Sequence, residues 1–410
     1  MIGLCLRDCV RPTSCGGSDM VTSKTNRKSW APPFCPNPNC RHHNNSEDSW
    51  PFKKIGFFWR LTPPHRIQRF TCKTCHRSFS TQTFSTSYWQ KRPDLDPKII
   101  MKTSGGMANR QIARDLKVSP ETINRHIARL GRHCLLFHNQ VMQNSPPVKE
   151  VVVDGFESFE FSQYYPIHHH VAVEKGTDFF IYFTDSELRR KGRMTEHQKR
   201  RRKELELKYG RPDPKAIEKD MRQTLEVVLK SRPAATVFSD DHPAYRRSIN
   251  TMTTNIDHRI TPGSAHRDKN NSLWEVNLLD LMIRHSNANH RRETIAWSKR
   301  RQGSAERLAI LLVWRNYMKG RREKVRGSPT PAMERGMMEQ PLEIEELLAR
   351  RIFRTRCELP PRWSEYYERR VTTRAIQGNR RHELKMAYYH NYGTTSEKFK
   401  AIDKVEKSLK

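Results

Sequence analysis

The sequence predicts a mixed α/β domain that is preceded by two small modules and followed by a charged tail with helical stretches. Three observations lead to this organisation. Short cysteine pairs occur within residues 34–79, apolar residues recur at helical spacing within 107–133, and strand-like runs begin at residue 150. With 410 residues, the chain is long enough for about two to four domains of ordinary size.

The composition indicates a polyanionic partner. The formal net charge is +32, from 76 Lys and Arg against 44 Asp and Glu. Such an excess repels itself unless a polyanion is near, and nucleic acid is the usual one. A basic membrane-peripheral patch is the less favoured alternative, because the charge is spread along most of the chain.

The sequence also indicates the compartment. The longest apolar run, LAILLVW at 308–314, is too short to span a bilayer, and the first 30 residues lack the apolar core of a secretory signal. We therefore expect a cytoplasmic protein with no membrane partner. Its nine cysteines would be thiols or metal ligands. Residues 1–30, with Cys5, Cys9 and Cys15, are expected to form a disordered leader without an assignable role.

The first predicted module spans residues 31–90. FCPNPNC and FTCKTCHRSF contain a C-x4-C pair and a C-x2-C pair separated by 31 residues. Two such knuckles can close four thiolates into a tetrahedron around Zn²⁺, and the aromatic segment between them can form small strands. We therefore expect a zinc ribbon that depends on Zn²⁺ for much of its folding energy. The predicted ligands are Cys35, Cys40, Cys72 and Cys75.

Residues 95–145 are predicted to form a helix-turn-helix DNA-binding domain. In MANRQIARDLKVSPETINRHIARLGRH, apolar residues recur at helical spacing, and Ser119 with Pro120 marks the start of the second helix. The exposed face of such a helix meets base edges and phosphates of double-stranded DNA. An ordinary helical hairpin is the alternative. The candidate DNA contacts are Thr122, Asn124, Arg125 and Arg129.

Residues 148–325 are predicted to form the α/β domain. EVVVDGFESFEF, HHHVAVEK and DFFIYFTDS read as three antiparallel strands, and ATVFSDDHPAY and NIDHRIT as two more. Helices are expected at 271–286 and 302–322. A polar helical insertion at 187–231 separates the third and fourth strands and holds nine Lys or Arg within residues 189–203. Strands and helices in this order are typical of mixed α/β layers.

Two of these strands end in aspartate, at Asp154 and Asp240. With an acid on a following helix, such residues can gather at one edge of a sheet, and an oxygen-rich cluster of this kind suits Mg²⁺ or Mn²⁺. Two ions about 3.5 to 4 Å apart can activate an attacking oxygen and stabilise the leaving one in phosphodiester displacement. Asp241 is expected to point to the opposite face of the sheet.

Roughly residues 34–325 resemble the transposases of bacterial insertion sequences that have an N-terminal zinc ribbon, a helix-turn-helix and an RNase H-like catalytic domain. The resemblance is carried by the order of these parts and by VVVDGFES, FSDDHPAY and VNLLDLMIRHSNANHRRETIAWSKRR. It implies an Asp-Asp-Asp or Asp-Asp-Glu triad, metal-dependent cleavage of transposon ends, and attack of the freed 3′ hydroxyl on target DNA. It also implies homo-oligomers that bridge two DNA ends. Asp154 and Asp240 match the first two acids.

The third acid stays open between two positions on one predicted helix. Glu275 follows Asp240 after 34 intervening residues, a spacing typical of the resembled family. Asp280 shares a helical face with Asn277 and Arg284, which would place a metal ligand, a hydrogen-bond donor and a phosphate-binding cation together. The sequence favours Asp280, with Arg284 as a DNA contact. Glu293 lies beyond this helix and is the weakest candidate.

Other interpretations fit parts of the sequence. A domesticated transposase would bind DNA without cutting it, and a zinc-ribbon transcription regulator would sense a ligand through its α/β domain. The intact acids argue against the first, and the missing glycine-rich phosphate loop against the second. The histidines at 168–170 are expected to be solvated or partly buried, because neighbouring strand residues face opposite sides. The tail at 326–410 has no assigned role.

Overall fold

The computed structural model describes residues 30–44, 49–230, 232–376, 378–379 and 389–390. The chain divides into two units, Met1–Pro33 and Phe34–Lys410, and the elements below lie in the second. Apart from Trp30, the expected leader and its three cysteines lie outside the described residues. Within the described part of the chain, no helix combines the length and the apolar character that a bilayer crossing requires.

A small antiparallel sheet forms at the N-terminal side of this unit, with the strand order β1-β2-β3-β9. Its core is a group of aromatic rings, among them Phe34, Trp50, Phe70 and Phe79, which pack edge-on or stacked. These rings lie next to the four predicted zinc ligands. The elements are β1 (Phe52–Trp59), β2 (Arg66–Cys72), β3 (Arg77–Ser80), β9 (Tyr389–His390) and the 3₁₀ helix η2 (Thr81–Phe84).

Three helices follow the small sheet. The last begins at the predicted cap, because the Ser119 side chain accepts from the Thr122 amide at 3.2 Å and Pro120 occupies the first helical position. This helix has 24 residues, has buried residues along both of its halves, and packs against α8. The helices are α1 (Leu95–Ser104), α2 (Asn109–Asp115) and α3 (Pro120–Gln143).

A five-stranded mixed sheet forms the centre of the unit, in the order β6-β5-β4-β7-β8. The first three strands in sequence pair antiparallel, whereas β7 and β8 pair parallel to β4 and to each other. This confirms the predicted mixed α/β class. The strands are β4 (Glu150–Glu160), β5 (Ser162–Glu174), β6 (Phe180–Glu187), β7 (Ala234–Asp240) and β8 (Asn255–Thr261).

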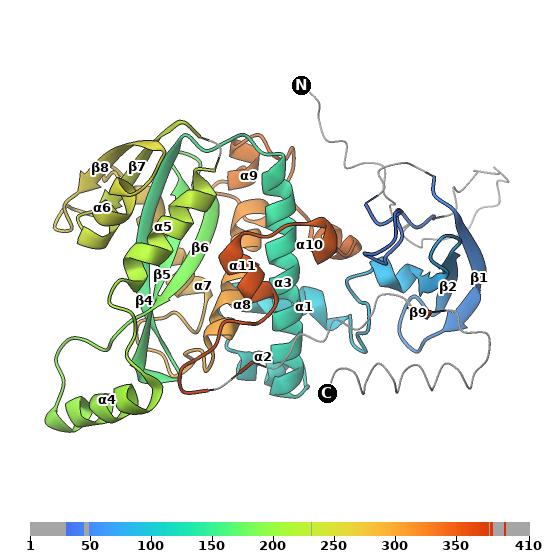
Figure 1. The fold of residues 1–410 in the computed structure, drawn as a ribbon, viewed down its shortest axis with the longest axis horizontal. Helices are drawn as coiled ribbons and strands as arrows, with labels where there is room; N and C mark the ends of the chain where they lie inside the picture. The colour runs from blue at the N-terminus through green and yellow to red at the C-terminus, as the bar shows by residue number, and fades with distance from the viewer. Residues whose placement is uncertain (1–29, 45–48, 231, 377, 380–388, 391–410) are drawn as a thin grey trace. The chain divides into compact units, whose positions relative to one another are not determined.

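Helices cover both faces of this sheet (Figure 1). On one face lie α5 (Ala216–Val228) and α6 (Pro243–Asn250). On the other lies α7 (Trp274–Ser286), with α8 (Arg301–Val313) and its π-helical extension η3 (Trp314–Met318) packed against α3. Helix α4 (Glu196–Tyr209) buries none of its side chains. The predicted insertion therefore contains one solvated helix and one, α5, that packs on the sheet.

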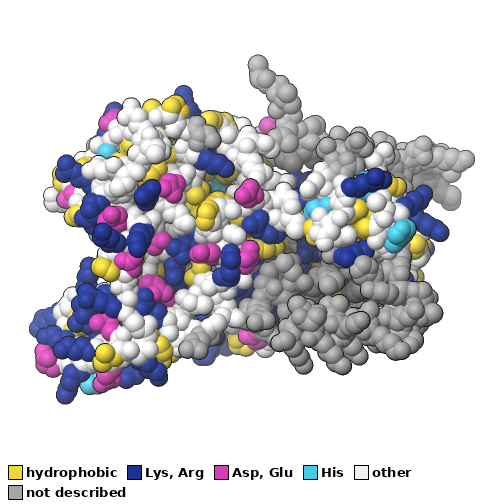
Figure 2. Space-filling model, in the orientation of Figure 1, with side chains coloured by type: hydrophobic (Ala, Val, Ile, Leu, Met, Phe, Trp, Pro, Cys, Tyr) yellow, Lys and Arg dark blue, Asp and Glu magenta, His cyan; other side chains and the backbone are white. Residues whose placement is uncertain are grey.

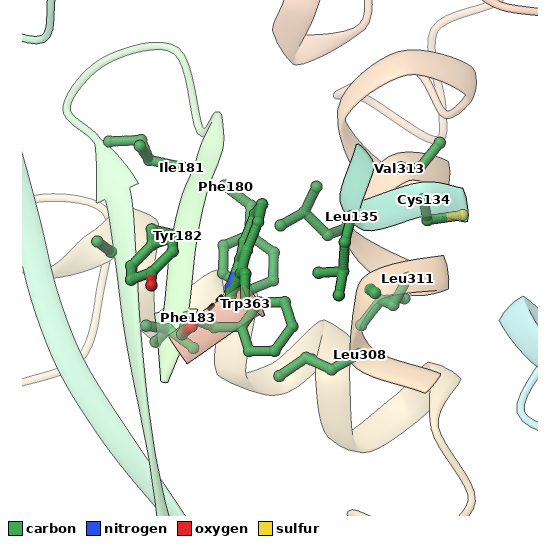
Figure 3. Packing of buried hydrophobic residues seen from close by; sticks show 14 of the residues in the cluster. Cys134, Leu135, Phe180, Ile181, Tyr182, Phe183, Leu308, Leu311, Val313 and Trp363 are labelled. Atoms are coloured by element: carbon green, nitrogen blue, oxygen red, sulfur yellow. Dashed lines mark hydrogen bonds between the residues drawn. The ribbon is translucent and has the colours of Figure 1, made fainter. Parts of the chain in front are cut away.

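The C-terminal segment contributes to both cores. Trp363 is only 1% exposed, donates from Nε1 to the Phe183 carbonyl at 3.0 Å, and lies between β6 and the Leu135 and Leu308 side chains (Figure 3). Phe353 packs in the aromatic core of the small sheet. The sequence assigned no role to this segment, which covers an edge strand. Its helices are α9 (Pro331–Glu334), α10 (Ile344–Ala349), η4 (Arg354–Arg356) and α11 (Pro361–Tyr367).

Candidate functional site

The parallel pairing of β4 with β7 sets the first two acids side by side. Glu150 pairs with Thr236, and Val152 pairs with Phe238. The same register, continued by two residues, places Asp154 opposite Asp240. Because residues that pair across a sheet point to the same face, both carboxyl groups lie on one face. The apolar residues ahead of Asp154 are fully buried and hold it in this position.

Asp154 lies in a strongly acidic environment. Its Oδ1 accepts a hydrogen bond from the Gly155 amide at 2.7 Å. Burial raises the pKa of Asp154 to about 7, and the nearby charges of Asp240 and Asp280 add to this rise. The two other aspartates are therefore close enough to act electrostatically on the first. A cation bound here would relieve this repulsion.

Helix α7 brings Asp280 to the same face of β4. Arg284, one turn later, donates from Nε to Asp280 Oδ2 at 3.1 Å, donates from Nη1 to the His290 carbonyl at 3.3 Å, and covers the Phe156 ring. Asp280 Oδ1 is buried and has no hydrogen-bond partner among the described residues. An orphaned carboxylate oxygen on a residue whose charge reaches Asp154 is available as a cation ligand.

The two other candidates for the third acid lie elsewhere. Glu275 is in the first turn of α7, and it accepts from Lys175 Nζ at 3.0 Å and from the Gly176 amide at 3.1 Å. Lys175 directly follows Glu174, the last residue of β5. Glu174 pairs with Val151 at the beginning of β4, three residues before Asp154. Glu293 is exposed in the loop after α7. The carboxylate of Glu275 is therefore already engaged, away from Asp154.

The acidic site is wider than a closed metal cage. Among the described residues, only the four cysteines of the small sheet have ligand atoms that all lie within 4.8 Å of one another. The three aspartates therefore form a more open arrangement. Three acidic residues, one with an orphaned oxygen, nevertheless fit Mg²⁺ or Mn²⁺, because such ions keep several waters and take few protein ligands.

His168 and His170 lie behind the site, on the face of the sheet opposite to the Asp154 carboxyl group. The expectation that His168–His170 are solvated or partly buried was wrong: they are 7%, 2% and 0% exposed. His168 Nε2 and the Tyr245 hydroxyl share a hydrogen bond of 3.1 Å, and the His168 ring lies over Gly155. A Cβ at Gly155 would stand 2.1 Å from His168 Nε2. The glycine after Asp154 is the sequence signal for this close approach.

The four predicted zinc ligands converge. Cys35 Sγ lies 3.6 Å from Cys75 Sγ, and Cys40 Sγ lies 3.8 Å from Cys72 Sγ. Sulfur atoms about 2.3 Å from one central ion lie roughly 3.8 Å apart in a tetrahedron. Burial raises the pKa of the Cys35 and Cys40 thiols, so a cation is needed to hold them as thiolates. This geometry fits Zn²⁺.

The predicted DNA contacts on α3 divide into two groups. Asn124 and Arg125 are exposed and Thr122 is half-buried, with Asn124 bonded to Asn109 and Arg125 paired with Glu121. Arg129 instead points inward and donates from Nε to the Thr86 carbonyl at 3.0 Å. The α2–α3 pair is fastened to the central domain through Arg307, which donates to the Met107 carbonyl at 2.9 Å.

The chain matches no protein-family model and no curated protein. Among solved structures, the simian T-cell lymphotropic virus intasome in complex with PP2A regulatory subunit B56 gamma aligns over 48% of this chain and 57% of the compared chain, with 13% identity and a TM-score of 0.22. The catalytic domain of Mos1 mariner transposase aligns over 61% of this chain and 95% of its own, with 11% identity and a TM-score of 0.17. Likeness this weak adds nothing to the geometry.

Proposed function

We propose that the protein is a DNA transposase that cleaves transposon ends and joins the freed 3′ hydroxyl to target DNA. The observation that carries the proposal is the placement of three acids. Asp154 and Asp240 lie at matching positions on neighbouring parallel strands, and Asp280 faces them from α7. The family resemblance of the sequence assigns the same chemistry to these positions, with an RNase H-like catalytic domain at residues 148–325.

Asp154, Asp240 and Asp280 would hold Mg²⁺ or Mn²⁺. When bound, such ions activate the attacking oxygen and neutralise charge on the leaving one. The protein contributes the position and the charge of the carboxylates. Arg284 fixes Asp280 through its hydrogen bond, and the buried β4 holds Asp154. Glu275, neutralised by Lys175, is the less suitable third acid.

DNA binding is proposed for three surfaces. The exposed start of α3 would read DNA through Thr122, Asn124 and Arg125, as in a helix-turn-helix. Figure 2 shows Lys and Arg side chains gathered over α4, none of whose residues is fully buried, so that its exposed basic side chains can lie against phosphates. A zinc ribbon held by the four cysteines would add a third basic surface. Bridging two DNA ends would require a homo-oligomer.

A nicking assay tests this function. The substrate is a plasmid that carries the DNA flanking the coding sequence, supplied with Mg²⁺ or Mn²⁺. We expect the wild type to nick it, and Asp154→Asn, Asp240→Asn and Asp280→Asn to lose at least about 100-fold in rate, because each removes charge from the reacting centre. Asp241→Asn is the matched control, since Asp241 is exposed beside Asp240.

Two outcomes would change the proposal. If Glu275→Gln abolishes nicking while Asp280→Asn does not, the third acid is Glu275. If the wild type binds these ends but leaves them uncut with either metal, the protein is a DNA-binding protein of the domesticated kind and not an enzyme.

A further inference from the structure

A cationic cavity lies on the far side of α3, away from the acidic site. Its volume is about 220 Å³, far more than one water molecule needs. It is open to solvent on one side and is lined by α3, the segment after η2, the start of α1 and the C-terminal segment. The lining includes Arg129, Arg132, Arg351, Tyr88, Trp89 and Asp96.

Three guanidinium groups meet in this cavity. Arg129 donates to the Thr86 and Tyr88 carbonyls, and Arg351 donates to the Thr83 carbonyl at 3.4 Å. Within the described part of the chain, Arg132 makes neither a hydrogen bond nor an ion pair, and neither of the others is paired with a carboxylate. The three positive charges therefore have no direct counter-charge.

The acids near the cavity are already engaged. Asp96 is 3% exposed, and its Oδ1 lies 2.6 Å from His126 Nδ1. Glu306, whose charge reaches Arg132, pairs with Arg369 at 3.2 Å. Burial, together with the charge of Arg351, lowers the pKa of Arg129 to about 10. The charges of Asp96 and Glu306 compensate Arg129 and Arg132 only in part, because both acids have other partners. Buried charge that is only partly compensated is costly, and a bound anion would offset it.

An aromatic ring stands at the same site. Trp89 lines the cavity and is 55% exposed, which is unusual for so large an apolar side chain. Its backbone has φ 60°, in the left-handed region that side chains other than Asn and Asp rarely occupy. The backbone at Trp89 is therefore held in a strained conformation, as is common at binding sites.

We propose that this cavity binds a nucleotide, with its phosphate between the three arginines and its base against Trp89. Guanidinium groups match phosphate oxygens in bidentate geometry, and an exposed tryptophan provides a stacking platform for any base. The phosphate can belong to a DNA strand or to a free nucleotide. The proposal involves none of the three aspartates, so it stands independently of the proposed function.

The experiment measures ligand-dependent thermal stability without added divalent cation. The probes are dAMP, deoxyadenosine, inorganic phosphate and a single-stranded oligonucleotide with no terminal phosphate. We expect dAMP to raise the melting temperature of the wild type and deoxyadenosine to leave it unchanged. Arg132→Gln should lose this rise. The matched control, Arg326→Gln, removes an equal charge from an exposed position and should keep it.

A second variant distinguishes the contribution of the base to binding from that of the phosphate. Trp89→Ala should bind dAMP about tenfold more weakly and inorganic phosphate equally well, because stacking serves only the base. If the oligonucleotide competes with dAMP, the site takes a DNA strand, and if it does not, the site takes a free nucleotide. The proposal is overturned if neither dAMP nor the oligonucleotide stabilises the wild type, or if Arg132→Gln responds as Arg326→Gln does. Trp89→Ala tests it even if Arg132→Gln fails to fold.

Discussion

The ionisation of a single residue, Asp154, links the acidic site to the folding stability of the protein. Its folded pKa of about 7 lies above the ordinary value of 3.8, so the folded chain keeps a proton that the unfolded chain has released. Stability from this group is therefore fully present below pH 4 and is lost as the pH rises to 7. At neutral pH the folded protein therefore loses stability when Asp154 ionises, and the resulting carboxylate can bind a cation.

We expect Asp154→Asn to be more stable than the wild type above pH 7 when no divalent cation is added. The gain should be at least about 1 kcal/mol, because the variant does not ionise in this acidic environment. Thermal unfolding between pH 4 and pH 8 measures it. Asp241→Asn should follow the wild type, because Asp241 is exposed. Parallel pH profiles for Asp154→Asn and the wild type would contradict the expectation.

Gly155 leads to a second prediction at this scale. Gly155→Ala should destabilise the protein by about 3 kcal/mol, because the new methyl group would collide with the His168 ring. Chemical denaturation gives the free energy of unfolding. The double variant with His168→Gly should recover part of this loss. If Gly155→Ala lowers the free energy of unfolding by less than about 0.5 kcal/mol, the His168 ring does not pack closely on the backbone of Gly155.

At the scale of elements, the small sheet joins a cysteine cluster to an aromatic core. The sheet is too small to be stabilised by burial alone, so the cluster must contribute much of its folding energy. The C-terminal segment adds Phe353 to this core, and His43 links it further through a hydrogen bond to the Thr355 hydroxyl at 2.8 Å.

We expect one zinc per wild-type chain, and none in Cys72→Ser, measured by atomic absorption on the purified protein. Cys72→Ser should also lose the near-ultraviolet signal of the aromatic core, because the metal holds the ligand loops together. Cys134→Ala is the control, since this thiol is buried outside the cluster. Equal zinc content in the wild type and Cys72→Ser would contradict the assignment.

At the scale of the whole molecule, the C-terminal segment and the long α3 connect parts that the sequence predicted as separate domains. The C-terminal segment packs in both hydrophobic cores, and α3 packs against α8. The sequence predicted that α3 reads DNA, and the structure shows that the same helix packs against α8. Gly131 permits this contact, because a Cβ there would stand 2.4 Å from the Glu306 carbonyl oxygen. Helices α2 and α3 are therefore fixed to the central domain.

We expect Trp363→Ala to lower the free energy of unfolding by about 3 to 5 kcal/mol, because it empties the centre of the core between β6 and α8. Trp59→Ala should change it by less than about 0.5 kcal/mol, since Trp59 is 74% exposed. Urea unfolding, followed by circular dichroism, compares the two. Similar values for both variants would show that the C-terminal segment does not pack as described.

Local patterns in the sequence determined the elements. Alternating and continuous apolar runs predicted the five central strands, and cysteine spacing predicted the sulfur cluster, because periodicity and knuckle spacing are properties of a few neighbouring residues. Asp154 and Asp240 were also visible, although their roles remain proposals. The expectation that a strand ends at Asp154 was wrong, because β4 continues to Glu160 through its pairing with β5, whereas β7 does end at Asp240. His168–His170 were misjudged, since their burial depends on residues that come later in the chain: Tyr245 of α6 contacts His168, and His290 contacts His169.

Only the tertiary structure decided which distant residues meet. The parallel register of β4 and β7 set Asp154 beside Asp240, and the docking of α7 gave Asp280 an orphaned oxygen while Lys175 engaged Glu275. The inward turn of Arg129 depends on carbonyls about 40 residues earlier in the chain, and Trp363 bonds to a carbonyl 180 residues away. Contacts of this kind follow from the summed packing of the whole chain, which no short stretch of sequence contains.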